Sequence, residues 1–365
     1  MLKNFIYSFL NKRGFDLKRI EKVTPIKEYK IENQIDPKVI QNILEFYKKI
    51  NPFYSSGIDE PLKIAGMWRK LLEKGRKSQL NCIRNNKKDE YLKLQENMFF
   101  NELIHGLWNY NFYDKNIVNC SSQFLEECRT FEKITNMKKE NLVTNNSWSC
   151  WGLSTDKGII KYTDPSHGIS AFHILTLLNN LNLNKIPMVL DLGSGFGGFA
   201  EKLMMWSKNK INICLIDIPL NLTIAYAYLS KIFGNDKVIL ISTKQQLLES
   251  TLNSGEFILI PTILIPDIPM NFQFDIVHNM HSFSEMDLHS VDYYLKKLAT
   301  KNVSFLVETN VNVSKSIMLE HLELKSSEFP IPEYFKLLTR FSDGIQTRYV
   351  TSIYANENKI FSSLL

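Results

Sequence analysis

Apolar residues recur at helical spacing through the first part of the chain. This spacing predicts helices at 2–12, 39–47, 61–72, 88–108 and 121–135. The third of these follows Asp59, Glu60 and Pro61 and stops before Gly75, the usual placement of proline and glycine around a helix. We therefore predict a mostly helical N-terminal domain over residues 1–150.

The helical pattern stops in a stretch near 141–168, where we place the domain junction in a loop. After a helix at about 168–182, short apolar runs alternate with helical segments near 220–233 and 287–298. The predicted parallel strands are 187–192, 211–216, 274–278 and 303–307, with 238–241 and 257–260 competing for the third position.

The end of the chain carries two further apolar runs, near 334–341 and 348–354, on either side of Ser342-Asp343-Gly344. Asp-Gly between such runs is a strong hairpin signal. Residues 151–365 thus predict an α/β domain with a Rossmann-like, doubly wound parallel sheet that closes with an antiparallel C-terminal hairpin.

The first predicted strand runs directly into a turn with four glycines, followed by a helix. Gly193, Gly195 and Gly198 satisfy the dinucleotide fingerprint G-x-G-x-x-G. Read with Asp191 and Gly197, the same turn gives D-x-G-x-G-x-G, which looks like motif I of class I S-adenosylmethionine (SAM) methyltransferases. Glycines let a ligand approach the backbone, and the first turn of a helix offers unpaired N–H groups.

Asp191, which precedes the turn, distinguishes a SAM site from a dinucleotide site. A carboxylate suits the ammonium group of SAM and would repel a pyrophosphate. We therefore predict a SAM site in the turn, formed by Asp191, Gly193, Ser194, Gly195 and Gly197.

A second acid, Asp217, ends the second predicted strand about 20 residues after Gly198. A carboxylate there can accept both ribose hydroxyls of a nucleoside, in NAD enzymes and SAM enzymes alike. We predict that Asp217, its neighbour Ile218 and Asn279, at the end of the fourth strand, complete the cofactor site.

Catalytic candidates follow the fourth strand, because open α/β sheets bind ligands at the carboxyl ends of their strands. We predict His281 as general base, since imidazole titrates near neutral pH. Glu285 would orient it, or would bind a divalent metal such as magnesium that acidifies a hydroxyl. The alternatives are a structural histidine and a helix N-terminal acid. His167, in the junction loop, is a second candidate base.

The whole chain of 365 residues has a net charge of +6, with +8 in residues 1–150 and −2 in the remainder. The basic part predicts an anionic acceptor on the N-terminal side; nucleic acid is disfavoured, because no Lys/Arg run appears. Five cysteines without a C-x-x-C motif indicate reduced thiols and no zinc site. We expect a cytoplasmic protein, with contact of residues 2–22 with the inner membrane face as the weaker alternative to a packed helix.

Three pieces together resemble the bacterial sugar O-methyltransferases of cell-surface polysaccharide loci. The pieces are 190–200, 216–219 and 274–286, and the resemblance covers roughly residues 160–310. It implies SAM as methyl donor and a hydroxyl of a glycan or sugar nucleotide as acceptor.

Two other functions stay open at this stage. One is an NAD-dependent sugar oxidoreductase, against which stand Asp191 and the absence of a Tyr-x-x-x-Lys pair in the cofactor domain. The other is a non-catalytic SAM-binding subunit of a glycan-assembly complex, since such a subunit could keep the glycine motif.

Overall fold

The computed structural model describes a large part of the chain. The described residues are 35–55, 68, 75–96, 98, 102–104, 117–143, 151–155, 158–181, 183–269, 272–300, 302–313, 316–318, 321–345 and 348–360. The predicted helix at 2–12, the membrane contact of residues 2–22 and, apart from Trp68, the helix at 61–72 lie outside them. The predicted domain boundary at 150 also lies outside the described residues, and it stays a prediction.

A sheet of eight strands forms the centre of the molecule, in the order β11-β12-β8-β7-β3-β4-β6-β5. Its strands are β3 (Met188–Leu192), β4 (Asn212–Asp217), β5 (Val238–Leu240), β6 (Phe257–Pro261), β7 (Ile276–Met280), β8 (Phe305–Val311), β11 (Phe335–Ser342) and β12 (Tyr349–Asn356). The neighbouring strands β8, β7, β3, β4, β6 and β5 pair in parallel. In contrast, β12 pairs antiparallel with both β8 and β11. The predicted Rossmann-like sheet with an antiparallel C-terminal hairpin is confirmed.

The two runs predicted to compete for the third strand are both in the sheet. β6 lies beside β4 and is buried along its whole length, and β5 pairs with the other side of β6 at the edge. The prediction that these two runs compete for one position was wrong, because a doubly wound sheet can take an extra parallel strand at its edge. The fourth strand begins at Ile276, two residues after its predicted start.

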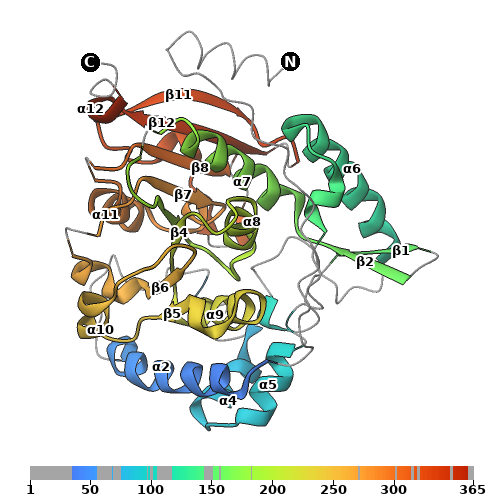
Figure 1. Cartoon of the computed structure of the whole chain (residues 1–365), viewed down its shortest axis with the longest axis vertical. Coiled ribbons are helices and arrows are strands. Elements are labelled where there is room, and N and C mark those ends of the chain that lie inside the picture. The colour runs from blue at the N-terminus through green and yellow to red at the C-terminus, as the bar shows by residue number, and fades with distance from the viewer. Residues whose placement is uncertain are drawn as a thin grey trace.

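Alternate side chains of the strands enter two different hydrophobic clusters. Val189 packs into the cluster that includes helices α7 (Pro165–Leu178), α8 (Gly198–Trp206) and α9 (Pro219–Phe233). Leu190 packs into the cluster that includes α10 (Lys244–Glu249) and α11 (Leu288–Leu298). Helices therefore cover both faces of the sheet, as Figure 1 shows. Because the strands are parallel, their carboxyl ends all lie on the same side of the molecule.

The N-terminal helices form an outer layer on one of these faces. They are α2 (Pro37–Ser55), α4 (Lys77–Arg84), α5 (Lys88–Glu96) and α6 (Ile117–Thr135), with 3₁₀ turns η3 (Glu102–Ile104) and η4 (Lys139–Leu142). α2 packs against α9 and α6 against α7, so these helices share a hydrophobic cluster with the sheet. The helices predicted at 39–47 and 121–135 are confirmed, whereas the one at 88–108 ends at Glu96.

The stretch predicted as a junction loop contains an antiparallel hairpin, β1 (Trp151–Thr155) and β2 (Gly158–Tyr162), and the helix that follows begins at Pro165. Asp164 explains that earlier start, because its side chain accepts the N–H of Ser166 as an N-cap. The remaining short elements are β9 (Ser316–Met318), β10 (His321–Leu322), η5 (Asn235–Lys237), η6 (Thr262–Asp267), η7 (Phe283–Glu285), η8 (Ser326–Glu328) and α12 (Glu357–Ile360).

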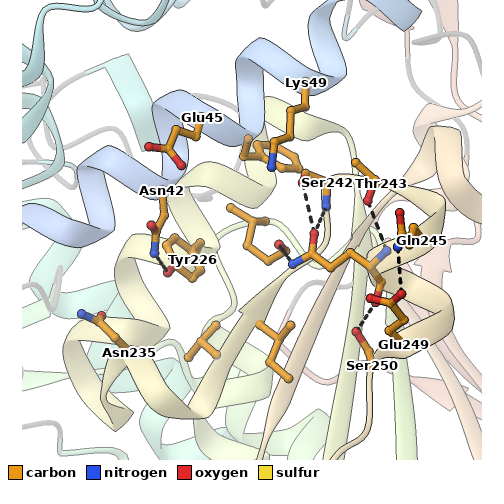
Figure 2. A pocket seen from close by; sticks show the side chains of 15 residues that line it. Asn42, Glu45, Lys49, Tyr226, Asn235, Ser242, Thr243, Gln245, Glu249 and Ser250 are labelled. Atoms are coloured by element: carbon orange, nitrogen blue, oxygen red, sulfur yellow. Dashed lines mark hydrogen bonds between the residues drawn. The ribbon is translucent and has the colours of Figure 1, made fainter.

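A side chain covers the open edge of β5. The Gln246 amide donates to the carbonyl of Leu240 (3.1 Å) and accepts the N–H of Ser242 (2.8 Å). It thus occupies the place that a peptide of a neighbouring strand would take. A polar pocket of about 680 Å³ lies beside this edge, between α2 and α10 (Figure 2). Its lining side chains bond to one another, for example Asn42 to Tyr226.

Within the described ranges, no helix is long and apolar enough to cross a membrane. Cys82, Cys128 and Cys214 are buried free thiols.

Candidate functional site

The glycine turn joins β3 to α8 with three residues in the left-handed region. Gly193, Gly195 and Gly197 have φ values of 75°, 58° and 90°. A Cβ atom on Gly193 would also lie 2.0 Å from the hydroxyl oxygen of Ser282, so any other residue there would have to displace Ser282. The turn therefore needs its glycines for two separate reasons, conformation and close approach.

Asp217 lies against this turn and is bonded to it. One carboxylate oxygen accepts the N–H of Gly195 (2.7 Å), and the other accepts the N–H of Ile218 and the amide of Asn221 (2.6 and 2.9 Å). Burial raises the pKa of Asp217 to about 6, while these bonds and the charge of Arg76 act in the opposite direction. The structure thus brings together the turn and the strand-end acid, two features separated in the sequence.

Asp191 is buried beneath the turn and pairs with His278 on the neighbouring strand β7. The distance from His278 Nδ1 to Asp191 Oδ1 is 2.9 Å, and the His278 ring stacks on Phe199 with 3.9 Å between centroids. Asp191 Oδ2 and the hydroxyl of Ser194 are buried without a hydrogen-bond partner in the described part of the chain. His278 was missed from the sequence; its register opposite Asp191 is the signal, and it needs the strand order.

Asn279, predicted as a cofactor contact, ties the end of β3 to the loop after β7. Its amide donates to the carbonyl of Leu192 (2.7 Å) and to the Ser282 hydroxyl. Its oxygen accepts from the N–H of Phe283 and from Asn310 (3.2 and 2.9 Å). In this structure its hydrogen bonds are therefore made to the protein, and they hold Ser282 against the turn.

His281 follows β7 in a left-handed conformation, with φ 65°, which is uncommon outside glycine. Its N–H donates to the carbonyl of Thr309 (2.8 Å), and its ring lies 4.2 Å from that of Tyr349. Nε2 is buried and has no hydrogen-bond partner among the described residues. Burial lowers the pKa of His281 to about 3, helped by His167 and Arg348, so the ring is neutral. The expectation that this ring titrates near neutral pH is therefore wrong for the buried position.

Glu285 bonds to the N-terminal part of the chain. The indole N–H of Trp68 donates to its carboxyl group (2.8 Å). Burial raises the pKa of Glu285 to about 8, and the nearby carboxyls of Glu323 and Asp217 act in the same direction. No hydrogen bond between described residues joins Glu285 to His281, so the predicted orienting contact is not formed here.

The magnesium role proposed for Glu285 has no support from the side chains around it. Across the part of the chain that the structure describes, no group of three His, Cys, Asp or Glu side chains could hold a metal ion.

His167 lies in the first turn of α7 and faces the glycine turn. Its ring meets Phe196 edge to face at 5.6 Å, and a Cβ atom on Gly198 would lie 2.6 Å from its Nδ1. Burial lowers the pKa of His167, and its charge would act on His281. The two predicted histidines are therefore near each other, although they are more than 100 residues apart in the sequence.

Further polar groups near His281 were not found from the sequence. Arg348 forms two bonds to Glu323 (2.6 and 2.9 Å), and its guanidinium lies 4.9 Å from the ring centroid of Tyr349. They come from the loop after β10 and the start of β12. No local motif marks them, because their neighbourhood with His281 depends on the antiparallel hairpin.

Comparisons with known proteins do not identify a family. No family model matches the chain, and no curated protein matches it. The solved structures that are similar include a magnesium protoporphyrin IX methyltransferase from Synechocystis PCC 6803 with bound SAH, at 10% identity and a TM-score of 0.37, covering 53% of this chain and 84% of that one.

Two others act on very different molecules by name. A mitomycin 7-O-methyltransferase has 10% identity and a TM-score of 0.34, covering 52% of this chain and 56% of that one. An rRNA methyltransferase from Streptomyces viridochromogenes has 10% identity and a TM-score of 0.34, covering 54% and 86%. Function depends on the residues of a site and not on the fold, so the chemistry has to be argued from the site itself.

Proposed function

We propose that this protein is a SAM-dependent O-methyltransferase that acts on a hydroxyl of a sugar or glycan precursor in surface polysaccharide biosynthesis. The observation that carries the proposal is the bond from Gly195 N–H to Asp217. It joins an acid-led glycine turn to the acid at the end of the next strand.

The residues around the turn fit the chemical groups of SAM. Asp191 Oδ2 is a buried carboxylate oxygen without a partner among the described residues, which suits the ammonium group. A carboxylate has about four acceptor sites, and three donors already reach Asp217. We therefore expect Asp217 to accept one ribose hydroxyl, rather than both.

When bound, SAM supplies an activated methyl group on a sulfonium. The protein then has to align the acceptor hydroxyl and to remove its proton as the new bond forms. His281 is the first candidate, because its ring is neutral and its buried Nε2 has no partner in the described chain, so Nε2 can accept the proton in the tautomer that carries hydrogen on Nδ1. Its lowered pKa makes it a weaker base than an ordinary imidazole. His167, on the side of the glycine turn, is the second candidate base.

The N-terminal residues support an acceptor side built by the helical domain. Trp68 reaches Glu285, and the basic charge of residues 1–150 suits an anionic acceptor such as a sugar nucleotide or a lipid-linked glycan. Attraction to such an acceptor is screened over about 8–10 Å near physiological ionic strength. The Michaelis constant of the acceptor should therefore rise with salt while that of SAM stays flat.

The test has two stages on the full-length protein. Calorimetry with SAM, SAH and NAD asks which nucleoside binds; tight NAD binding without SAM binding would overturn the proposal in favour of the oxidoreductase. Incubation with methyl-labelled SAM and a panel of sugar nucleotides and glycolipids then asks for transfer. SAM binding without transfer to any member of the panel would favour the non-catalytic subunit.

A further inference from the structure

Arg76 is a fully buried cation at the start of a helix. It is the N-cap residue of α4 and is 0% exposed. Neither fact follows from the helix: N-caps favour short side chains that accept hydrogen bonds, and a positive charge at a helix N-terminus opposes the helix dipole. Arginine is also almost never fully buried unless it is paired. Its position therefore has to be explained by its surroundings.

The guanidinium group of Arg76 is linked to the proposed cofactor acid through one residue. It donates to the amide oxygen of Asn221 (2.7 Å), and the amide nitrogen of Asn221 donates to Asp217 (2.9 Å). Asn221 lies in the first turn of α9, directly after β4. A chain of two hydrogen bonds thus runs from the N-terminal domain to the carboxylate that also accepts from the glycine turn.

The same guanidinium group lies over the ring of Trp68, 5.6 Å from its centroid, and Trp68 in turn donates to Glu285. One buried cation is therefore linked through a single residue to Asp217 and through another to Glu285. Asp217, Tyr91 and Glu102 are among the titratable groups whose charge acts on the pKa of Arg76, and the charge of Asp217 in turn acts on the pKa values of Glu285 and Tyr294. Of the side chains named in this paragraph, Arg76 is the one that carries a positive charge.

We propose that Arg76 is a positioning residue for the cofactor acid: through Asn221 it orients the Asp217 carboxylate toward the glycine turn and keeps it charged. This inference rests on the proposed function, because it assigns Asp217 to the ribose of SAM. It also makes the N-terminal domain part of the cofactor site. The helices before residue 100 then do more than cover α9.

The experiment measures SAH binding by calorimetry between about pH 5 and 8.5 with the full-length protein. The ionised carboxylate is the better acceptor for a ribose hydroxyl, so affinity should be highest above the pKa of Asp217, about 6, and should fall below it. Removing the cation raises that pKa. For Arg76→Met we therefore expect the midpoint to move upward. A rise of about one unit would lower the ionised fraction at pH 6 from about one half to about one eleventh, so SAH binding should be about fivefold weaker at pH 6 and nearly restored at pH 8.

Three variants separate this role from simple anchoring of the helices. Arg76→Lys keeps the charge, and its midpoint should stay near that of the wild type. Arg76→Gln is neutral but keeps a donor, and it carries the same prediction as Arg76→Met if the latter does not fold. Tyr91→Phe is the matched control: it removes the buried hydroxyl that bonds to Gln79, Gln95 and Thr223. Burial raises the pKa of Tyr91 above its ordinary value, so the hydroxyl is neutral over this pH range and its loss removes no charge. The variant should lower thermal stability and leave the midpoint unchanged.

The outcomes are distinct. If the wild type binds neither SAM nor SAH, the proposed function fails and this inference fails with it. If the wild type binds SAH but the neutral variants have the wild-type pH profile, or lose affinity equally at every pH, only the role of Arg76 is overturned.

Discussion

The two sides of the candidate site are built in opposite ways. The cofactor side is made of consecutive residues in a single strand, turn and helix, to which Asp217 is added by its neighbouring strand. The proposed acceptor side contains Trp68, Glu285 and Arg348, and the first and last of these are more than 200 residues apart in the sequence. The first side depends on backbone conformation, and the second depends on how the N-terminal and C-terminal parts pack around β7 and β8.

This contrast indicates that cofactor binding and acceptor binding are separable by mutation. Changes in the turn should weaken SAM binding and leave the Michaelis constant of the acceptor unchanged. Changes on the acceptor side should do the reverse. Arg76 is the predicted exception, because it lies over Trp68 and is linked to Asp217 through Asn221.

The largest effect is expected at His281, where only the chemical step should change. His281→Ala should lower kcat by about 10²–10⁴-fold, the range for a general acid or base, with SAM affinity within about twofold of wild type. Since burial lowers the pKa of His281 to about 3, the wild-type pH–rate profile should show no titration of this ring near neutrality. A variant with normal turnover would transfer the role to His167.

The second-largest effect is expected at Asp217, on the cofactor side. Asp217→Ala removes the acceptor for the ribose and leaves the N–H of Gly195 and the amide of Asn221 without this partner. Calorimetry should show SAM binding weaker by about 1–3 kcal/mol, the cost of leaving buried polar groups unpaired. An unchanged affinity would mean that the nucleoside lies elsewhere.

Gly193→Ala tests whether the turn has to keep its backbone conformation. A left-handed residue with a side chain costs about 1–2 kcal/mol, and here the added Cβ would also collide with Ser282. We expect SAH affinity to fall by at least about fivefold. Gly255→Ala is the control: this residue also has a positive φ (81°) but is packed against Asn209, so it should lower stability without weakening SAH binding by the folded protein.

The smallest effect is expected on the acceptor side. Trp68→Phe keeps the aromatic ring and removes only the N–H that donates to Glu285. A net loss of about 0.5–1.5 kcal/mol, typical of one hydrogen bond, should appear in the Michaelis constant of the acceptor and not in that of SAM. A larger change in the SAM constant would contradict the separation of the two sides.

The sequence was informative where function depends on local geometry. The strands, the glycine turn and Asp217 were predicted, because alternation, positive-φ glycines and a strand-end acid are properties of short segments. The prediction that 238–241 and 257–260 compete for the third strand was wrong for the opposite reason, because the order of strands along the sheet is a long-range property. His278 and Arg348 were missed in the same way: their partners, Asp191 and Glu323, are defined only by the pairing of strands and the packing of loops.

The covered edge of β5 has a consequence for how copies of this chain can associate. The unpaired N–H and C=O groups of an exposed edge strand can hydrogen-bond to a strand of another chain, and such pairing leads to aggregation. At Leu240 and Ser242 the side-chain amide of Gln246 already uses the groups that an incoming strand would need. At this end of β5, a strand from another copy could therefore pair only after the Gln246 side chain had been displaced.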